Sequence, residues 1–143
     1  PIPHKFMVGT TAQLFDFIAQ EVKTFLAEHN MTRTSSSASS SSPVPIGFTF
    51  SYPMHQTGLK NGTLICWTKG FNIQDTQGKD LVQLLQDALS ELGVEARVEA
   101  ILNDTVGTLA ASKYKDTATQ VGVILGTGSN AAYIEKKKSI SKL

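Results

Sequence analysis

The first candidate for chemistry is the segment Asn103-Asp104-Thr105, which follows the apolar run 98–102 and precedes the helix-like stretch 106–114. Open α/β sheets place reactive groups at the C-terminal ends of buried strands, so Asp104 is a candidate catalytic carboxylate. A structural role competes with this one. Asp or Asn before a helix accepts hydrogen bonds from otherwise unpaired backbone N–H groups as an N-cap. Taken alone, the segment favours the cap.

A second candidate is Trp67-Thr68-Lys69-Gly70-Phe71, in which two aromatic residues surround two polar side chains and a glycine. This composition can hold a hydroxylated ligand against an apolar wall. A strand end with a solvent-facing lysine explains it equally well.

A third candidate is the turn Gly126-Thr127-Gly128-Ser129-Asn130. Two glycines separated by a threonine can present backbone N–H groups and a hydroxyl to phosphate oxygens. The segment is neither a Walker loop nor a dinucleotide fingerprint, because the glycine spacing, the terminal lysine and the following helix are missing. Alone, it reads as an ordinary glycine-rich hairpin.

Helices and strands must position these segments. Apolar residues recur at three- and four-residue intervals over 11–29 and 79–92, which predicts amphipathic helices, and a further helix is expected over 105–114. Thr10 or Thr11 can cap the first helix, and Gly93 can end the second. Strands are predicted over 46–52, 62–68, 94–102, 121–125 and 131–135, with an irregular connection rather than a tight hairpin over 54–61. The serine-rich stretch at about 33–45 is expected to be a mobile surface insertion.

Composition excludes several classes of protein. The 143 residues carry a net charge of +1, so no broad field attracts nucleic acid or anionic lipid, and we expect neither as a partner. The basic run Lys136-Lys137-Lys138 is expected to be solvated surface. No apolar run approaches the roughly 18 residues of a membrane span, and no signal sequence is evident. The first residue is Pro1 rather than methionine, which favours a processed or incomplete chain.

Cysteine and histidine content argues against redox and metal chemistry. The single cysteine, Cys66, excludes an intrachain disulfide and favours a reducing compartment, so we expect a cytoplasmic protein, with association with mitochondria left open. Its apolar neighbours favour a buried, unreactive thiol. His4, His29 and His55 lack zinc-ligand spacing, so we expect no metal bound directly by the protein.

Four segments occur in one order: Gly47-Phe48-Thr49-Phe50-Ser51-Tyr52-Pro53, Trp67-Thr68-Lys69-Gly70-Phe71, Asn103-Asp104-Thr105-Val106-Gly107-Thr108 and Gly126-Thr127-Gly128-Ser129-Asn130. Together they resemble the eukaryotic hexokinase family, including glucokinases, over nearly the whole chain. The resemblance implies an α/β architecture of the actin-like ATPase (ribonuclease H-like) fold. It implies that residues 1–104 belong to the small lobe and that 105–143 form the hinge and the start of the large lobe.

The resemblance also implies roles for individual residues. Asp104 matches the base that accepts the proton of the sugar 6-hydroxyl as the γ-phosphoryl group of ATP moves in line. Residues that match ligands of the sugar hydroxyls are Ser51, Thr68, Lys69, Asn103 and Asn130. Gly126, Thr127 and Gly128 match part of the site for the ATP phosphates, with Mg²⁺ held mainly through the nucleotide. Glucose and related hexoses are the implied substrates.

Parts of the family pattern are missing. The upstream phosphate loop Asp-Leu-Gly-Gly-Thr-Asn, two downstream sugar-binding glutamates and the adenosine-binding segment are absent, and Glu135 stands in the wrong context to replace a glutamate. The chain is therefore expected to be a fragment with little or no kinase activity of its own. Two alternatives stay open: a non-catalytic sugar sensor or regulatory protein of the same family, and a different actin-like ATPase.

Overall fold

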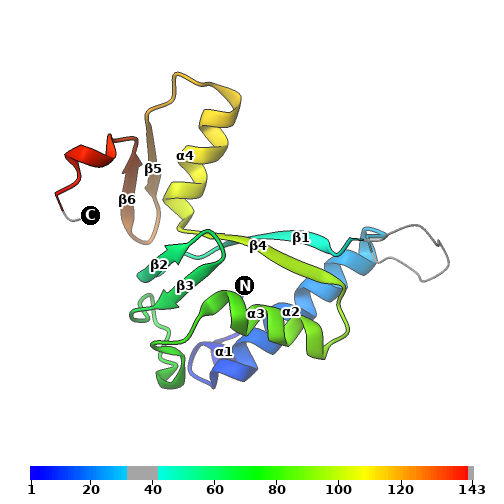
Figure 1. Cartoon of the computed structure of the whole chain (residues 1–143). Coiled ribbons are helices and arrows are strands. Elements are labelled where there is room, and N and C mark those ends of the chain that lie inside the picture. Colours follow the sequence, from blue (N-terminus) through cyan, green and yellow to red (C-terminus); the bar gives the residue numbers. More distant parts are fainter. Residues whose placement is uncertain (32–41, 142–143) are drawn as a thin grey trace. The chain divides into compact units, whose positions relative to one another are not determined.

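The computed structural model describes residues 1–31 and 42–141, which form helices and short strands in two compact units (Figure 1). Unit 1 comprises residues 1–48 and 52–101, and unit 2 comprises 49–51 and 102–143. The elements of unit 1 are α1 (His4–Met7), α2 (Thr11–Glu28), β1 (Val44–Thr49), β2 (Met54–Gly58), β3 (Asn61–Leu64), the 3₁₀ helix η1 (Gln74–Thr76), α3 (Leu81–Glu91) and β4 (Ala96–Leu102). Those of unit 2 are α4 (Asp104–Lys115), β5 (Val121–Leu125), β6 (Ser129–Tyr133) and the 3₁₀ helix η2 (Lys137–Ser139). β1 and β4 each end with a residue assigned to unit 2.

The core of unit 1 lies around the packed helices α2 and α3, and α3 also packs on β3. Its most deeply buried large side chains are Phe15, Leu64, Ile73, Leu81, Leu85, Leu89 and Ile101. β1 and β4 pair in parallel, because the N–H of Val44 donates to Glu95 O and the N–H of Phe50 donates to Leu102 O. Parallel strands with a helix on the connecting path are typical of α/β folds, which confirms the predicted mixed class.

Both long helices of unit 1 begin at side-chain caps. Thr10 and Gln13 form a capping box, with Gln13 N–H donating to Thr10 Oγ1 at 3.3 Å and Thr10 N–H donating to Gln13 Oε1 at 3.0 Å. Asp80 Oδ1 accepts the N–H groups of Val82 and Gln83 at the start of α3. Gly93 has φ +65°, the left-handed conformation that ends a helix. The predicted helices over 11–29 and 79–92 are thereby confirmed to within two residues at each end.

The connection predicted over 54–61 is wrong. β2 and β3 form an antiparallel hairpin in which Met54 pairs with Leu64 and Gly58 pairs with Asn61. The hairpin was missed because β2, with the sequence Met-His-Gln-Thr-Gly, is exposed over most of its length and shows no apolar alternation.

Several predicted boundaries also change. β3 ends at Leu64 rather than at residue 68, and β1 covers Val44–Thr49 rather than 46–52. Val44 and Pro45, predicted to lie in the serine-rich insertion, are the first residues of β1. The rest of that predicted insertion lies largely outside the described residues. The short helices α1, η1 and η2 were not predicted, because they are too short to show a periodic pattern.

Unit 2 consists mainly of α4 packed on the β5–β6 hairpin. Gly122 lies close to α4, because a Cβ built there would lie 3.0 Å from the backbone N of Leu109. The residues of β5 that point to the opposite face from Gly122 are exposed; they are Val121, Val123 and Leu125. The predicted strand over 121–125 is confirmed, whereas its partner covers Ser129–Tyr133 instead of 131–135.

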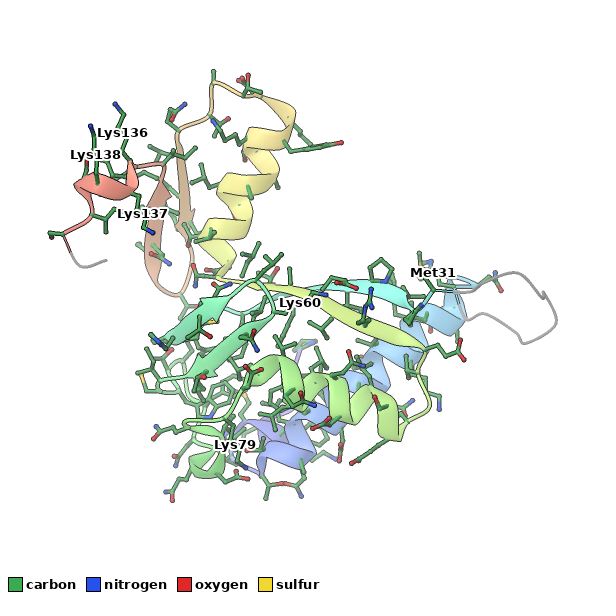
Figure 2. All side chains as sticks on the ribbon, in the orientation of Figure 1. Met31, Lys60, Lys79, Lys136, Lys137 and Lys138 are labelled. Atoms are coloured by element: carbon green, nitrogen blue, oxygen red, sulfur yellow. The ribbon has the colours of Figure 1, made fainter. Side chains whose placement is uncertain are left out.

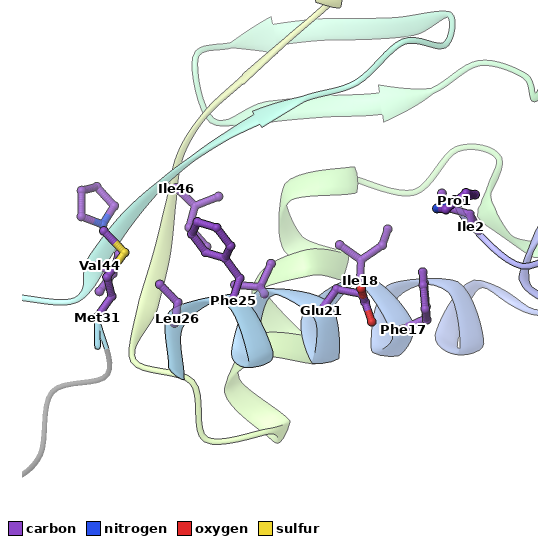
Figure 3. A pocket seen from close by; sticks show the side chains of 12 residues that line it. Pro1, Ile2, Phe17, Ile18, Glu21, Phe25, Leu26, Met31, Val44 and Ile46 are labelled. Carbon is purple, nitrogen blue, oxygen red and sulfur yellow. The ribbon is translucent and has the colours of Figure 1, made fainter. Parts of the chain in front are cut away.

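An apolar groove of about 660 Å³ lies along α2 beside β1 in unit 1 (Figure 3). Its lining residues are Pro1, Ile2, Phe17, Ile18, Glu21, Val22, Phe25, Leu26, Met31, Val44, Pro45 and Ile46. Helix α2 therefore buries Leu14, Phe15 and Ala19 on one face and leaves apolar side chains such as Phe25, which is 53% exposed, on another. Within the ranges that the structure describes, no helix has the length and apolarity that crossing a membrane requires.

Candidate functional site

Asn103 and Asp104 are neighbours at the start of α4, and both accept a hydrogen bond from the same backbone N–H. Asn103 is the N-cap, and its Oδ1 accepts the N–H of Thr105 at 3.1 Å. Asp104 is the first residue of the helix, and its Oδ1 accepts the same N–H at 2.8 Å and the Thr105 hydroxyl at 3.3 Å. Among the described residues, no hydrogen bond reaches Asp104 Oδ2. The Thr105 N–H is thus shared by both side chains, and the second carboxylate oxygen of Asp104 takes no part in the cap.

Ser51 and Asn103 follow two neighbouring strands at the same edge of a sheet. The N–H of Phe50 donates to Leu102 O at 2.8 Å, which aligns the last residues of the parallel pair. Ser51 comes next after Phe50, and Asn103 comes next after Leu102. Both are half-buried, as is Asp104. This is the edge at which α/β sheets gather binding and reactive groups.

Asn130 of β6 joins this group directly, because its Nδ2 donates to Asn103 Oδ1 at 3.1 Å. Its own Oδ1 accepts the N–H of Ala131 at 2.9 Å. Asn103 Oδ1 therefore accepts from two donors, and the orientation of both amides is fixed. Residues 103 and 130 are far apart in the sequence, and this hydrogen bond brings them together.

The predicted phosphate turn, Gly126-Thr127-Gly128, connects β5 to β6. The N–H of Gly126 donates to Gly128 O at 3.1 Å, which closes the turn. A Cβ built on Gly128 would meet no atom within 4 Å, and all three residues are exposed. The turn therefore leaves open space beside its backbone, which suits a phosphate but does not demand one.

Thr68 and Lys69 belong to unit 1, at the tip of a tight turn. The N–H of Phe71 donates to Thr68 O at 3.1 Å, and both side chains at the tip are exposed. Half-buried aromatic rings from Trp67, Phe71 and Tyr52 pack together at the base of the turn. Burial raises the pKa of the Tyr52 hydroxyl. Sequence reasoning missed Tyr52 as part of this cluster, and its position directly after Ser51 was the available signal.

Several lysines lie elsewhere on the described surface, among them Lys60, Lys79 and the run Lys136, Lys137 and Lys138 (Figure 2). Lys60 and Arg97 both contact Glu99, and they lower the pKa of that half-buried carboxyl. Lys136, Lys137 and Lys138 are exposed at η2, as expected of a solvated run. Among residues 1–31 and 42–141, no three His, Cys, Asp or Glu side chains are grouped so that they could hold a metal ion. Cys66 is half-buried.

Comparison with known proteins extends these observations. The sequence model of the family described as Hexokinase matches residues 1–114. The chain belongs to the hexokinase family. It is 48% identical over 142 residues to Hexokinase-7 of Oryza sativa subsp. japonica, covering 99% of this chain and 30% of that protein. It is 44% identical over 155 residues to the Glucokinase of Aspergillus niger, covering 99% of this chain and 31% of that protein.

A solved structure agrees with the sequence relatives. The hexokinase from Schistosoma mansoni complexed with glucose superposes with a TM-score of 0.88 at 38% identity, over 99% of this chain and 30% of that chain. The predicted family and its actin-like fold are thus confirmed. The chain spans about 30% of the length of these relatives.

Proposed function

We propose that this chain is part of an enzyme that transfers the γ-phosphoryl group of ATP to the 6-hydroxyl of glucose and related hexoses, with Asp104 as the base. The observation that carries the proposal is the second carboxylate oxygen of Asp104 at the start of α4. Asn103 caps the helix, whereas Asp104, half-buried beside it, has one carboxylate oxygen that receives no hydrogen bond from the described residues. An oxygen held at a strand end in this way can orient a hydroxyl and accept its proton.

The residues that would bind the sugar are Ser51, Thr68, Lys69, Asn103 and Asn130. Those in unit 2 support this role through the ordered amide pair Asn103–Asn130 and the shared strand edge with Ser51. Polar groups fixed in this way discriminate strongly, because a substrate that lacks a hydroxyl leaves them unpaired.

The turn Gly126-Thr127-Gly128 would hold part of the ATP phosphates, through backbone N–H groups and the Thr127 hydroxyl. The open space beside Gly128 fits this role. When bound, ATP supplies the phosphoryl group, with Mg²⁺ held mainly through the nucleotide. The contribution of Asp104 is to hold the 6-hydroxyl in line and to take its proton.

We also propose that residues 1–104 form part of the small lobe of the whole enzyme and that 105–143 form the hinge and the start of the large lobe. The passage from unit 1 to unit 2 at residues 101–102, near the predicted boundary, supports this division. Because the chain spans only about 30% of its relatives, we infer that it has little or no kinase activity alone. Formation of glucose 6-phosphate by the purified 143 residues would overturn that inference.

The decisive test is Asp104→Asn in a full-length enzyme that contains this segment. Turnover should fall by about 10²- to 10⁴-fold, because general-base catalysis contributes that much, while glucose affinity stays within a few-fold. Steady-state kinetics and calorimetric glucose titration measure the two effects separately.

Asp116→Asn is a matched control, because Asp116 lies at the other end of the same helix and, within the described part of the chain, its carboxylate accepts only the local N–H of Ala118. It should leave turnover unchanged. If Asp104→Asn kept its turnover and only lowered stability, Asp104 would be a structural residue, and a sugar-binding protein without catalysis would be favoured.

A further inference from the structure

The backbone at Lys69 is in a conformation that lysine rarely adopts. Lys69 has φ +56° and Gly70 has φ +84°, so both central residues of the turn Thr68–Phe71 are left-handed, as in a type I′ turn. Asn, Asp and Gly are the usual residues at such positions. Among the described residues, the only other non-glycine residue with positive φ is Asn30. Strained residues of this kind persist where surrounding contacts over-determine them, and they cluster at functional sites.

The surrounding contacts come from three aromatic rings. Trp67 and Phe71, which flank the turn, stack with centroids 5.2 Å apart and planes 20° apart. Tyr52 packs edge-on against both, at 5.0 Å from Trp67 and 5.2 Å from Phe71. Trp67 Nε1 donates to Ile73 O at 2.9 Å, which anchors the stack to the chain that follows. The base of the turn is therefore fixed while its tip is exposed.

Tyr52 also contacts the Lys69 side chain, whose Nζ lies 5.2 Å from the centroid of the Tyr52 ring. An ammonium over an aromatic face within about 6 Å is attracted by the ring quadrupole. The stem of a lysine is long and flexible, so a contact of its ammonium narrows the range of rotamers that the side chain samples. A single ring that contacts both flanks of the turn and the ammonium can restrict the backbone and the side chain together.

We propose that Tyr52 is a positioning residue that holds Lys69 ready for the substrate through its ring. The proposal rests on the proposed function, in which Lys69 binds the sugar. The contacts of Tyr52 with Trp67, Phe71 and Lys69 are made by its ring, so Tyr52→Phe is a conservative variant that keeps them. Tyr52→Leu removes the ring, and Tyr52→Met is a second ring-free variant of greater length that can be used if the leucine variant does not fold.

The contact itself is tested first, by NMR of the 143-residue chain. The ring current of Tyr52 should shift the Lys69 ε-methylene protons, and the shift should persist in Tyr52→Phe and vanish in the ring-free variant. An unchanged shift in a folded ring-free variant would overturn the proposal, whatever the function of Lys69.

The consequence for the reaction is tested in a full-length enzyme that contains this segment. Loss of the cation–π contact should raise the KM for glucose by about two- to fivefold, with a smaller change in kcat, whereas Tyr52→Phe should match the unmodified enzyme. In a Lys69→Met background, the ring-free variant should add no further increase in KM.

Two results distinguish a failure of the Tyr52 proposal from a failure of the proposed function. If Lys69→Met alone leaves the kinetics unchanged, the assignment of Lys69 to the sugar is wrong and the proposed function loses that residue. If Lys69→Met is damaging but the ring-free variant is silent, or acts equally in both backgrounds, the positioning role of Tyr52 is wrong while the proposed function stands.

Discussion

Units 1 and 2 differ in what holds them together. Unit 1 buries a continuous set of large side chains between α2, α3 and β3, and Leu89 is wholly inaccessible. Among the described apolar residues of unit 2, only Phe50 and Leu109 are buried, while Leu125 is 82% exposed. The stability of the smaller unit therefore depends more on local contacts, which are the helix cap at Asn103, the Asn103–Asn130 hydrogen bond and the close packing of Gly122 on α4.

The difference bears on function, because the proposed base lies in the less buried unit. Local stability varies across a protein, and regions with few buried contacts open most readily. In unit 2, Asp104 and its neighbour Asn103 are held mainly by hydrogen bonds, and few buried apolar side chains surround them. The arrangement that would carry the chemistry is therefore the one most sensitive to single substitutions.

The largest contrast should come from two leucines. Leu89→Ala in unit 1 should lower the free energy of unfolding by about 2–5 kcal/mol, since it leaves a cavity in the core. Leu125→Ala in unit 2 removes an exposed side chain and should change it by less than about 0.5 kcal/mol. Urea unfolding of both variants measures the difference. A loss in the Leu125 variant as large as that in the Leu89 variant would contradict the exposure of the Leu125 side chain.

Two glycines of unit 2 provide a smaller, internal contrast. Gly122→Ala places a Cβ 3.0 Å from the Leu109 backbone and should destabilise the packing of α4 on β5 by about 1–3 kcal/mol. Gly107→Ala adds a Cβ in open space on α4 and should stabilise the unit by about 0.5–1 kcal/mol.

Hydrogen exchange at the amides of α4 reports these changes in unit 2 itself. Exchange should quicken in the Gly122 variant and slow in the Gly107 variant. Equal behaviour would mean that close approach at Gly122 does not hold unit 2 together.

The smallest expected effect is a pH dependence confined to unit 1. Asp75 accepts a hydrogen bond from the Thr11 N–H at the start of α2, and bonding to Thr11 lowers its pKa from the usual 3.8. A lowered pKa means that the stabilisation is complete at neutral pH and is lost as the pH falls through the lowered value.

Asp75→Asn should therefore cost a few tenths of a kcal/mol at pH 7, because the exposed carboxylate is screened by solvent. The difference from the unmodified chain should vanish in strong acid. Melting curves from pH 7 to pH 2, with hydrogen exchange at α2, measure it. A difference that persisted at the acid end would exclude ionisation as its source.

Much of this architecture could be predicted from the sequence because the informative elements are long or periodic. Helices α2 and α3 each show an apolar stripe along one face. The end of α3 could also be predicted, because Gly93 adopts the left-handed conformation that glycine tolerates best. β2 could not be predicted, because an exposed strand has no buried face to impose alternation.

The candidate site could be predicted in part from the sequence. The four segments named Asn103 and Asn130 as members of one site, but the hydrogen bond between them depends on the fold. The Asn-Asp pair predicted a helix cap, and the structure shows that both side chains accept the N–H of Thr105. The contacts of Tyr52 with Lys69 depend on a left-handed lysine, which no residue pattern indicates.

The apolar groove beside α2 affects how this chain should be studied. Its volume of about 660 Å³ lies in the range of cavities that accept drug-sized molecules. Environment-sensitive dyes such as anilinonaphthalene sulfonate are commonly used to detect partly unfolded proteins, because they fluoresce on exposed apolar surface. The folded 143 residues already present such a surface, so a bright dye signal from this chain would not diagnose misfolding.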